Sequence, residues 1–411
     1  MAWKMSDVGH LVDPNFGVDP YFERVVGLAE CSDRHIKYMF KYVWPTISSS
    51  RQVIVGQKAI ISYAHIGLFA TGDRTLDIFG KGHILIEDYF GKGKTLFGQV
   101  PAILLGGKFT RFQGAVDNLP ADFTGNRVRE QNAAGRVYYR IVEGPAFGDI
   151  ILLDEANRNT TRTQSAFLEP IAEAKATIFG ETRPLKHPPW VILTQNPIET
   201  EGTFPFSEAF ADRIMFKVRG EWFTAKTFAE IDERTASFDV LRRGLKQVCD
   251  FEMVDEIRDF FLREIYLDPD LRESCMGRFN EIMNNPHRFG YLLDLADEFG
   301  GSLIKSGMWG RGFTHWVGAA KTMAAFRYRD YVTPDDVLKV LFPILRHRVV
   351  FAPGVLDCFL DKWRKQDTNN DIKKGAWWRI KKNAKKGSPW KQMDRNDVID
   401  IIIARLVKEA W

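Results

Sequence analysis

A glycine followed by a lysine and a threonine, Gly93-Lys94-Thr95, has the residue types and spacing of a loop that binds phosphate groups. Residues 83–86 before the loop have strand-like character, and a helix is predicted from Leu96. In this layout successive backbone N–H groups and the helix N-terminus point at one anion. Lys94 would reach the outer phosphates of a nucleotide, and the Thr95 hydroxyl would ligate Mg²⁺. We therefore expect one continuous segment to contact the nucleotide: Gly91, Lys92, Gly93, Lys94, Thr95 and Leu96.

The loop departs from the full phosphate-binding pattern at its first position. The pattern has a glycine five residues before Gly93, where this chain has Asp88. A carboxylate beside a triphosphate repels it unless the side chain turns away. A degenerate glycine loop can also be an ordinary strand-to-helix turn. The inference that this loop binds a nucleotide therefore depends on residues further along the chain.

Two carboxylates follow an apolar run at Ile150–Glu155. The run predicts a buried parallel strand, and ligands of open α/β sheets bind at the carboxyl ends of such strands. Asp154 would hold Mg²⁺ through water, and Glu155 would accept a proton from an attacking water molecule. Strands that end in Asp-Glu also occur by chance. The presence of Gly93-Lys94-Thr95 upstream strengthens the interpretation of Asp154 and Glu155 as site residues.

A third polar strand end is Asn196, which follows the apolar residues 190–193. Its amide could orient the attacking water or sense the γ-phosphate of the nucleotide. Alternatively, Asn196 caps a turn before Pro197.

Gly56-Gln57 precedes an apolar-periodic segment, Lys58–Phe69, which predicts a helix ahead of the phosphate loop. Such a helix and the loop before it often wall the adenine base. An ordinary packing helix is the alternative.

The composition is that of a globular protein: 411 residues, 45% hydrophobic and 27% charged, enough for two or three domains. We find no apolar run near the roughly 20 residues of a membrane helix and no apolar core of a secretion signal at the N-terminus. Four cysteines lie far apart without metal-type spacing, so we expect reduced and buried thiols in a cytoplasmic protein. They are Cys31, Cys249, Cys275 and Cys358.

The formal net charge of +4 is uneven. From Lys362 to Arg395 there are 12 Lys+Arg and 3 Asp+Glu, so this segment carries +9 and the remainder about −5 by subtraction. The same segment contains Trp363, Trp377, Trp378 and Trp390. Basic residues with aromatics can bind single-stranded nucleic acid or an acidic protein surface, but we favour a solvated face anchored by tryptophans. Beyond it, a helix over Asp394–Ala410 is predicted to pack through Val398, Ile401, Ile402 and Leu406.

Other segments are assigned by pattern. Residues 1–45 are aromatic and should pack on the body, and Pro45 with Ser48-Ser49-Ser50 looks like a linker. Ala115–Phe147 is a long insertion whose second half alternates like one arm of a hairpin, and Lys175–Pro188 suggests another hairpin. Glu221–Arg348 is helical in pattern, with Thr333-Pro334-Asp335-Asp336 as a helix start.

Taken together, the ordered motifs resemble the MoxR-type AAA+ ATPases, of the helix-2-insert branch, continuously from about Val53 to Val350. The matching stretches lie in the same order as in the family: Val55–Gln57, Gly82–Glu87, Gly93–Thr95, Leu119–Gly125, Leu153–Arg158, Thr163–Glu169, Thr194–Glu199, Glu201–Thr203, Asp212-Arg213, Arg329–Val337 and Leu345–Arg348.

The resemblance implies an α/β fold: an AAA+ αβα core with a central parallel sheet, followed by a helical lid and terminal extensions, assembled as a homo-hexameric ring. We place an N-terminal extension at 1–50, the ATPase core at 51–220, the lid at 221–351 and a basic extension at 352–411. The insertion at about 115–147 corresponds to the family's helix-2 insert and the segment at about 175–188 to its hairpin before sensor 1. Both usually face the pore or a partner surface.

The resemblance also assigns site roles. Asn196 takes the sensor 1 position. Arg213 corresponds to the arginine finger that reaches a neighbour's ATP, with Arg158 as the second candidate. Arg311, at the end of Gly307–Arg311, corresponds to the sensor 2 arginine on the lid, which comes from the same subunit as Lys94 and Mg²⁺. Trp309 and Gly310 replace the family's Ser-Pro there, which puts the helix start in question.

The activity implied is hydrolysis of Mg²⁺-ATP by a chaperone that remodels or activates a partner protein. Metal or cofactor insertion with a von Willebrand A domain client is one task that the resemblance implies. A nucleic-acid motor is an alternative, and deletion of the basic tail would then abolish nucleic-acid binding. A nucleotide-binding scaffold with little turnover is a second alternative, favoured by Asp88 and by Tyr89-Phe90 in place of the family's small residue and proline.

Overall fold

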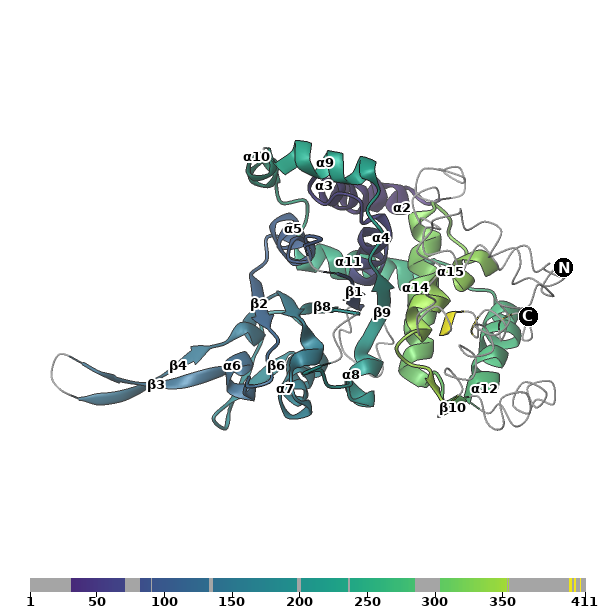
Figure 1. Ribbon diagram of the computed structural model, residues 1–411. Coiled ribbons are helices and arrows are strands. Elements are labelled where there is room, and N and C mark those ends of the chain that lie inside the picture. Colours follow the sequence, from purple (N-terminus) through teal and green to yellow (C-terminus); the bar gives the residue numbers. More distant parts are fainter. Residues whose placement is uncertain are drawn as a thin grey trace.

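A five-stranded parallel sheet forms the centre of the protein, as seen in the computed structural model (Figure 1). The structure describes residues 31–70, 82–89, 91–132, 136–197, 201–235, 237–284, 304–352 and 354, and single residues 399, 400, 403 and 407. The strand order is β2-β5-β8-β1-β9, and every neighbouring pair is parallel. The strands are β1 (His83–Glu87), β2 (Phe109–Gln113), β5 (Ile150–Asp154), β8 (Trp190–Gln195) and β9 (Ile214–Arg219).

Both faces of the sheet are covered by helices, which explains the continuous apolar runs of the central strands. Successive residues alternate between two hydrophobic clusters: Ile150 and Leu152 face one, Ile151 and Leu153 the other. The first cluster includes residues of α3 (Trp44–Val53), α4 (Lys58–Phe69) and α5 (Leu96–Leu105), and the second includes residues of α6 (Pro120–Thr124), α7 (Thr161–Glu173) and α8 (Glu208–Arg213). The predicted αβα core is confirmed.

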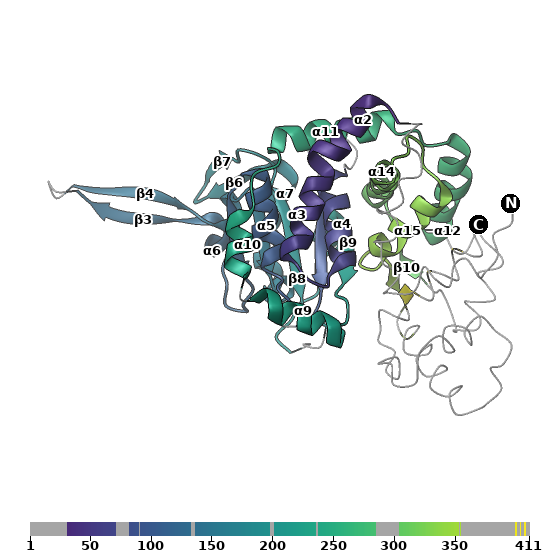
Figure 2. The ribbon, with the colours of Figure 1, turned by 90° about the horizontal axis from the view of Figure 1, so that it is seen from above.

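Two antiparallel hairpins leave the core. β3 (Gly125–Gln131) pairs with β4 (Val137–Glu143), and this ribbon projects far from the body in both views (Figures 1 and 2). β6 (Lys175–Ile178) pairs with β7 (Glu181–Pro184), which confirms the hairpin predicted at 175–188. At its tip Phe179 is 68% exposed.

The N-terminal segment differs from the prediction. The residues interpreted as a linker form α3, with Pro45 in its first turn, where proline is tolerated. This helix crosses the boundary placed at residue 50 and packs on α4 and α5. Phe16, Tyr21 and Phe22 lie outside the described residues.

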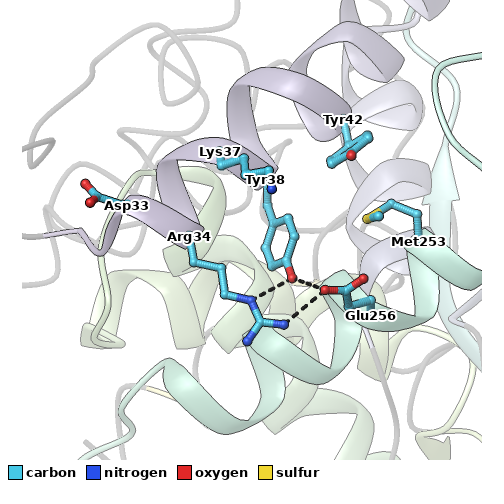
Figure 3. Close-up of a pocket in the computed structure, with 7 residues that line it drawn as sticks. All are labelled: Asp33, Arg34, Lys37, Tyr38, Tyr42, Met253 and Glu256. Carbon is cyan, nitrogen blue, oxygen red and sulfur yellow. Dashed lines mark hydrogen bonds and ion pairs between the residues drawn. The ribbon is translucent and has the colours of Figure 1, made fainter.

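Before α3, the helix α2 (Asp33–Tyr38) and the π-helical turn η2 (Met39–Val43) anchor the segment on α11 (Phe251–Glu264). Tyr38 donates to Glu256 Oε1 at 2.5 Å, and Arg34 donates to both (Figure 3). A shallow pocket of about 420 Å³ opens beside these side chains.

The helical region after β9 has two parts. α9 (Ala225–Thr235) and α10 (Phe238–Gly244) lie beside α3, whereas α12 (Arg278–Asn284), α14 (Gly310–Phe326) and α15 (Pro334–Leu345) form the group on the far side of β9 (Figures 1 and 2). The remaining elements are the turns η3 (Pro145–Phe147), η4 (Ala156–Arg158) and η5 (Leu271–Gly277) and the strands β10 (Ile304–Ser306) and β11 (Val350–Phe351).

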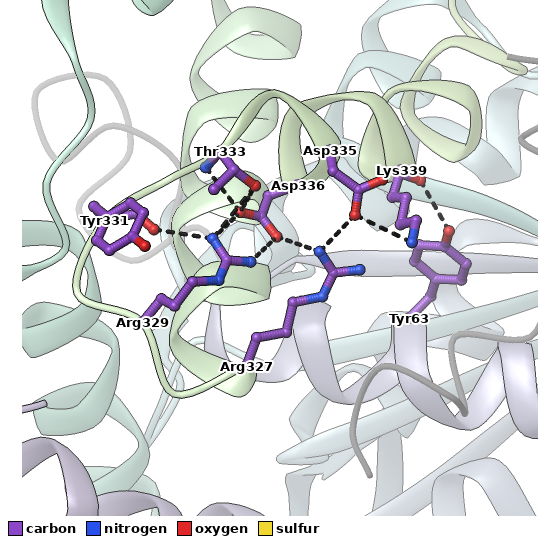
Figure 4. Close-up of polar contacts among 8 residues, drawn as sticks. All are labelled: Tyr63, Arg327, Arg329, Tyr331, Thr333, Asp335, Asp336 and Lys339. Carbon is purple, nitrogen blue, oxygen red and sulfur yellow. Dashed lines mark hydrogen bonds and ion pairs between the residues drawn. The ribbon is translucent and has the colours of Figure 1, made fainter. Parts of the chain in front are cut away.

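The start of α15 is fixed by a buried ionic cluster (Figure 4). Asp336 caps the helix by accepting from the N–H and hydroxyl of Thr333, and it also pairs with Arg327 and Arg329. The predicted helix start is therefore confirmed. Tyr63 of α4 donates to the Lys339 carbonyl at 2.9 Å, which ties the core to the lid.

The C-terminal residues that the structure describes pack on the body. Asp400 forms a bidentate ion pair with Arg346, at 2.8 and 2.6 Å, and Ile403 and Val407 are buried. The residues predicted to form the packing face of this last helix lie outside the described part of the chain: Val398, Ile401, Ile402 and Leu406. Within the described part of the chain, no helix has the length and apolarity to cross a membrane.

The buried His65 in α4 predicts a pH dependence of stability. Burial lowers its pKa to about 4, so between pH 6.5 and 4 the unfolded chain binds a proton that the folded protein does not. The stabilisation is complete above pH 6.5 and is lost as the pH falls, by about 2 kcal/mol at pH 5. His65→Gln should flatten this part of the curve in urea unfolding between pH 7.5 and 5. Parallel curves for the two proteins would contradict the assignment.

Candidate functional site

The carboxyl ends of β1, β5 and β8 bring most of the predicted site residues to one edge of the sheet. Lys94 lies in the loop after β1, Asp154 ends β5, and Asn196 follows β8. Burial lowers the pKa of Lys94, while the charges of Asp88, Asp154 and Glu155 act in the opposite direction. The Lys94 ammonium therefore interacts electrostatically with all three carboxylates.

The phosphate loop uses its glycines for backbone shape. Gly91 and Gly93 have φ angles of 74° and 73°, in the region that side chains disfavour. A Cβ built at Gly91 would meet nothing within 4 Å, which leaves room beside the loop. Lys94 Nζ donates to the Asp88 carbonyl, and α5 begins at Leu96, as the loop-to-helix layout predicts.

Asp154, the predicted metal residue, already contacts a cation. Its Oδ2 accepts from Arg111 Nη2 at 2.6 Å and Nε at 3.2 Å, and its Oδ1 accepts from the Thr194 hydroxyl at 2.5 Å. A carboxylate that binds a guanidinium at the edge of a sheet fits a cation in general, Mg²⁺ included. Arg111 was not predicted as a site residue, because only the pairing of β2 with β5 brings it to Asp154.

Glu155 adopts a backbone conformation that is uncommon for a residue with a side chain, with φ at 50°. Its N–H donates to the Thr194 hydroxyl at 2.9 Å, so Thr194 bridges the two acidic residues. Its carboxylate pairs with Arg158 at 2.7 Å. Arg158, the second candidate for the trans arginine, thus lies on the carboxylate of its own subunit.

Gln57 and Lys92 meet at the side chain of Asp88, and Gly56 directly precedes Gln57. Gln57 Nε2 and Lys92 Nζ both contact the Asp88 carboxylate, at 3.0 and 2.8 Å. Gly56 has a φ angle of 75°, and a Cβ there would come within 2.4 Å of Thr227 in α9. The Asp88 carboxylate is turned toward the end of β9, where a Cβ on Gly220 would meet it at 1.9 Å.

The structure does not bring Arg213 and Arg311 to Lys94. Arg213 ends α8 immediately before β9, and Ile214 pairs with His83 at the start of β1. The phosphate loop follows the other end of β1, about 13 Å away along a strand of this length. Arg311 Nη1 pairs with Asp212 at 2.8 Å, beside Arg213.

Arg311 therefore pairs with Asp212 in this structure, and its sensor 2 role at the nucleotide of its own subunit stays a prediction. The helix α14 packs against α8, and Arg311 in its first turn reaches Asp212 there. The helix itself begins at Gly310 with Trp309 as its N-cap residue, so the loss of the family's Ser-Pro does not prevent the start.

Arg348, which the sequence analysis did not single out as a site residue, joins the lid to this region. Its guanidinium donates to the carbonyls of Asp212 and Ile214 at 2.9 and 2.6 Å and contacts His315 of α14. Burial lowers the pKa of Arg348 to about 10. These bonds fix the backbone that presents Arg213.

Comparisons with known proteins agree with this geometry. Residues 83–216 match the ATPase family associated with various cellular activities (AAA), and residues 302–357 match the AAA lid domain. The chain is 32% identical over 307 residues to Chaperone MoxR1 of Mycobacterium tuberculosis, covering 74% of this chain and 75% of that protein. The chain belongs to the MoxR-type AAA+ ATPases.

Other members of the family align over similar lengths. Protein MoxR of Methylorubrum extorquens is 28% identical over 290 residues, which cover 68% of this chain and 82% of that protein. The crystal structure of a candidate ATPase from Cytophaga hutchinsonii superposes with a TM-score of 0.67 at 28% identity, covering 82% of this chain and 95% of that one. The fold of this chain is therefore shared with a solved ATPase structure, in agreement with the family assignment.

Proposed function

We propose that this MoxR-type protein hydrolyses Mg²⁺-ATP and uses the reaction to remodel a partner protein. The observation that supports this most is the convergence of Lys94, Asp154, Glu155 and Asn196 at one edge of the sheet. Hydrolysis of a phosphoanhydride needs neutralised charge and a positioned water molecule, and this set of side chains offers both.

Each residue has a defined task in this proposal. Lys94 and the loop N–H groups bind the outer phosphates, and Gly56 and Gln57 border the base. Thr95 and Asp154 would hold Mg²⁺ once Asp154 is released from Arg111, and the ion would neutralise phosphate charge. Glu155 accepts a proton from the attacking water, which Asn196 orients. Glu155 must leave Arg158 to do so.

Arg213 and Arg311 are proposed to act on the ATP of a neighbouring subunit. Both lie on the far edge from their own phosphate loop, and both flank Asp212. A head-to-tail interface repeated around a ring would bring this edge to the neighbour's site. A homo-hexamer is the ring that the family favours.

The proposed client is a protein. The relative named Chaperone MoxR1 supports this. We further propose that the client carries a von Willebrand A domain and that the task is metal or cofactor insertion. The β3–β4 ribbon and the exposed Phe179 offer surfaces for such a partner or for the pore of the ring.

Phosphate release by the purified protein tests the proposal. The wild type should release phosphate from ATP in the presence of Mg²⁺, and excess EDTA should stop the reaction. Lys94→Met should abolish both turnover and ATP binding because the charge beside the phosphates is lost. Lys108→Met, at an exposed lysine before β2, is the matched control and should behave as wild type. ATP binding without turnover by the wild type would favour the scaffold alternative.

A further inference from the structure

The side chain that breaks the phosphate-loop pattern is the centre of a closed ring of polar contacts. Asp88 is only 2% exposed. Its Oδ1 accepts from the N–H of Tyr89 at 2.8 Å and pairs with Lys92 Nζ at 2.8 Å, and its Oδ2 accepts from Gln57 Nε2 at 3.0 Å. A buried carboxylate is stable only with such a set of donors.

The ring closes through Glu221, in the linker that follows β9. Gln57 Oε1 accepts from the Glu221 N–H at 3.0 Å, and Lys92 Nζ donates to the Glu221 carbonyl at 2.7 Å. The Glu221 carboxylate in turn accepts from the N–H of Ala59 at 2.6 Å. Three segments distant in sequence are thereby joined: the phosphate loop, the start of α4 and the linker to α9.

Aromatic rings complete the enclosure of Lys92. Its ammonium lies 5.0 Å from the ring centroid of Phe223 and 5.5 Å from those of Tyr89 and Trp222. Its side chain is only 10% exposed. Cation–π contacts and two hydrogen-bonding oxygens account for this lysine without any contact to a nucleotide.

We propose that Asp88, Lys92, Gln57 and Glu221 form a positioning ring that sets the shape of the phosphate loop and ties it to the linker toward the lid. Asp88 replaces the missing glycine because Lys92 neutralises it, and the two residues depend on each other. Lys92 is then a positioning residue, rather than the phosphate ligand expected from the sequence. This inference rests on the proposed ATP binding at the adjacent Lys94.

A pair of substitutions tests the mutual dependence. Lys92→Met leaves a buried carboxylate without its cation and should weaken Mg²⁺-ATP binding by about 10- to 100-fold, with kcat changed much less. Adding Asp88→Gly removes that carboxylate and restores the glycine of the general pattern, so the double variant should return to within about threefold of the wild-type Kd. Lys226→Met, at an exposed lysine of α9, is the matched control. If the double variant binds ATP as weakly as Lys92→Met, Lys92 contacts the nucleotide and the ring is not its role.

Gly220 provides an independent test. An added Cβ there would lie 1.9 Å from Asp88 Cγ, so Gly220→Ala should displace the carboxylate and weaken ATP binding. In the Asp88→Gly background the same substitution should have little effect. An equal loss in both backgrounds, or none in either, would overturn the proposal.

The melting temperature of the nucleotide-free protein separates this inference from the proposed function. If the wild type fails to bind ATP, the proposed function is wrong, but the ring still predicts a lower melting temperature for Lys92→Met and recovery in the double variant. The absence of that pattern would overturn the ring whatever the ATP result.

Discussion

Glu155→Gln should remove ATP turnover while leaving ATP binding intact. Glutamine has the shape of glutamate but cannot accept the proton of the attacking water, and general bases of this kind contribute about 10²- to 10⁴-fold to a rate. The amide can still accept the hydrogen bond from Arg158, so the loop around η4 should keep its structure. Because ATP then stays bound between subunits, we also expect the assembly to be more stable.

Three measurements on the same protein check this result: phosphate release, ATP affinity and oligomer size by native mass spectrometry. Glu233→Gln, at an exposed glutamate of α9, is the control and should match the wild type in all three. Equal phosphate release by wild type and Glu155→Gln would remove Glu155 from the role of base, and Arg158→Ala would then show whether their ion pair only holds the turn.

The site residues at the carboxyl ends of the strands could be predicted, because buried parallel strands have a recognisable apolar pattern in the sequence. Apolar runs buried on both faces end in Asp154-Glu155 and in Asn196, and a parallel sheet places all such ends on one side. Gly93-Lys94-Thr95 follows a third strand of the same kind. The pattern therefore specified the edge without knowledge of the strand order.

Features that depend on contacts between distant segments could not be predicted from the sequence. The order β2-β5-β8-β1-β9 decides that Arg111 reaches Asp154, but nothing local to Arg111 reveals it. The position of α14 on α8 decides where Arg311 points. Pro45 and three serines suggested a linker, yet packing of α3 on the core outweighs their weak helix preference.

Asp88 shows why a local rule can fail in a functional loop. A glycine is favoured at the first loop position because a side chain there meets the surrounding backbone. In this chain Gly220, directly after β9, supplies the missing space, and Gln57 and Lys92 supply the donors. A substitution that looks disruptive in the motif is compensated by Lys92 within the loop and by Gln57 and Gly220 outside it.

Mixed assemblies of two inactive variants should recover ATP turnover if the arginines act across the subunit boundary. Arg213→Ala should lower turnover by about 10³-fold, as expected for a finger that stabilises transition-state charge. In a 1:1 mixture with Glu155→Gln, about a quarter of the interfaces would pair an intact Glu155 with an intact Arg213, given random head-to-tail assembly.

The same mixture made with Arg311→Ala locates the second arginine. Arg311 pairs with Asp212 at the edge of the sheet opposite its own phosphate loop, so it too should be complemented by Glu155→Gln. If Arg311 acted within its own subunit, every intact Glu155 would sit beside a missing Arg311, and the mixture would stay inactive. Recovery with Arg213→Ala but not with Arg311→Ala would support a role of Arg311 within its own subunit. In that case α14 would have to move toward the phosphate loop. Recovery with neither would contradict a shared site, because two defects that lie in one subunit's site cannot compensate each other.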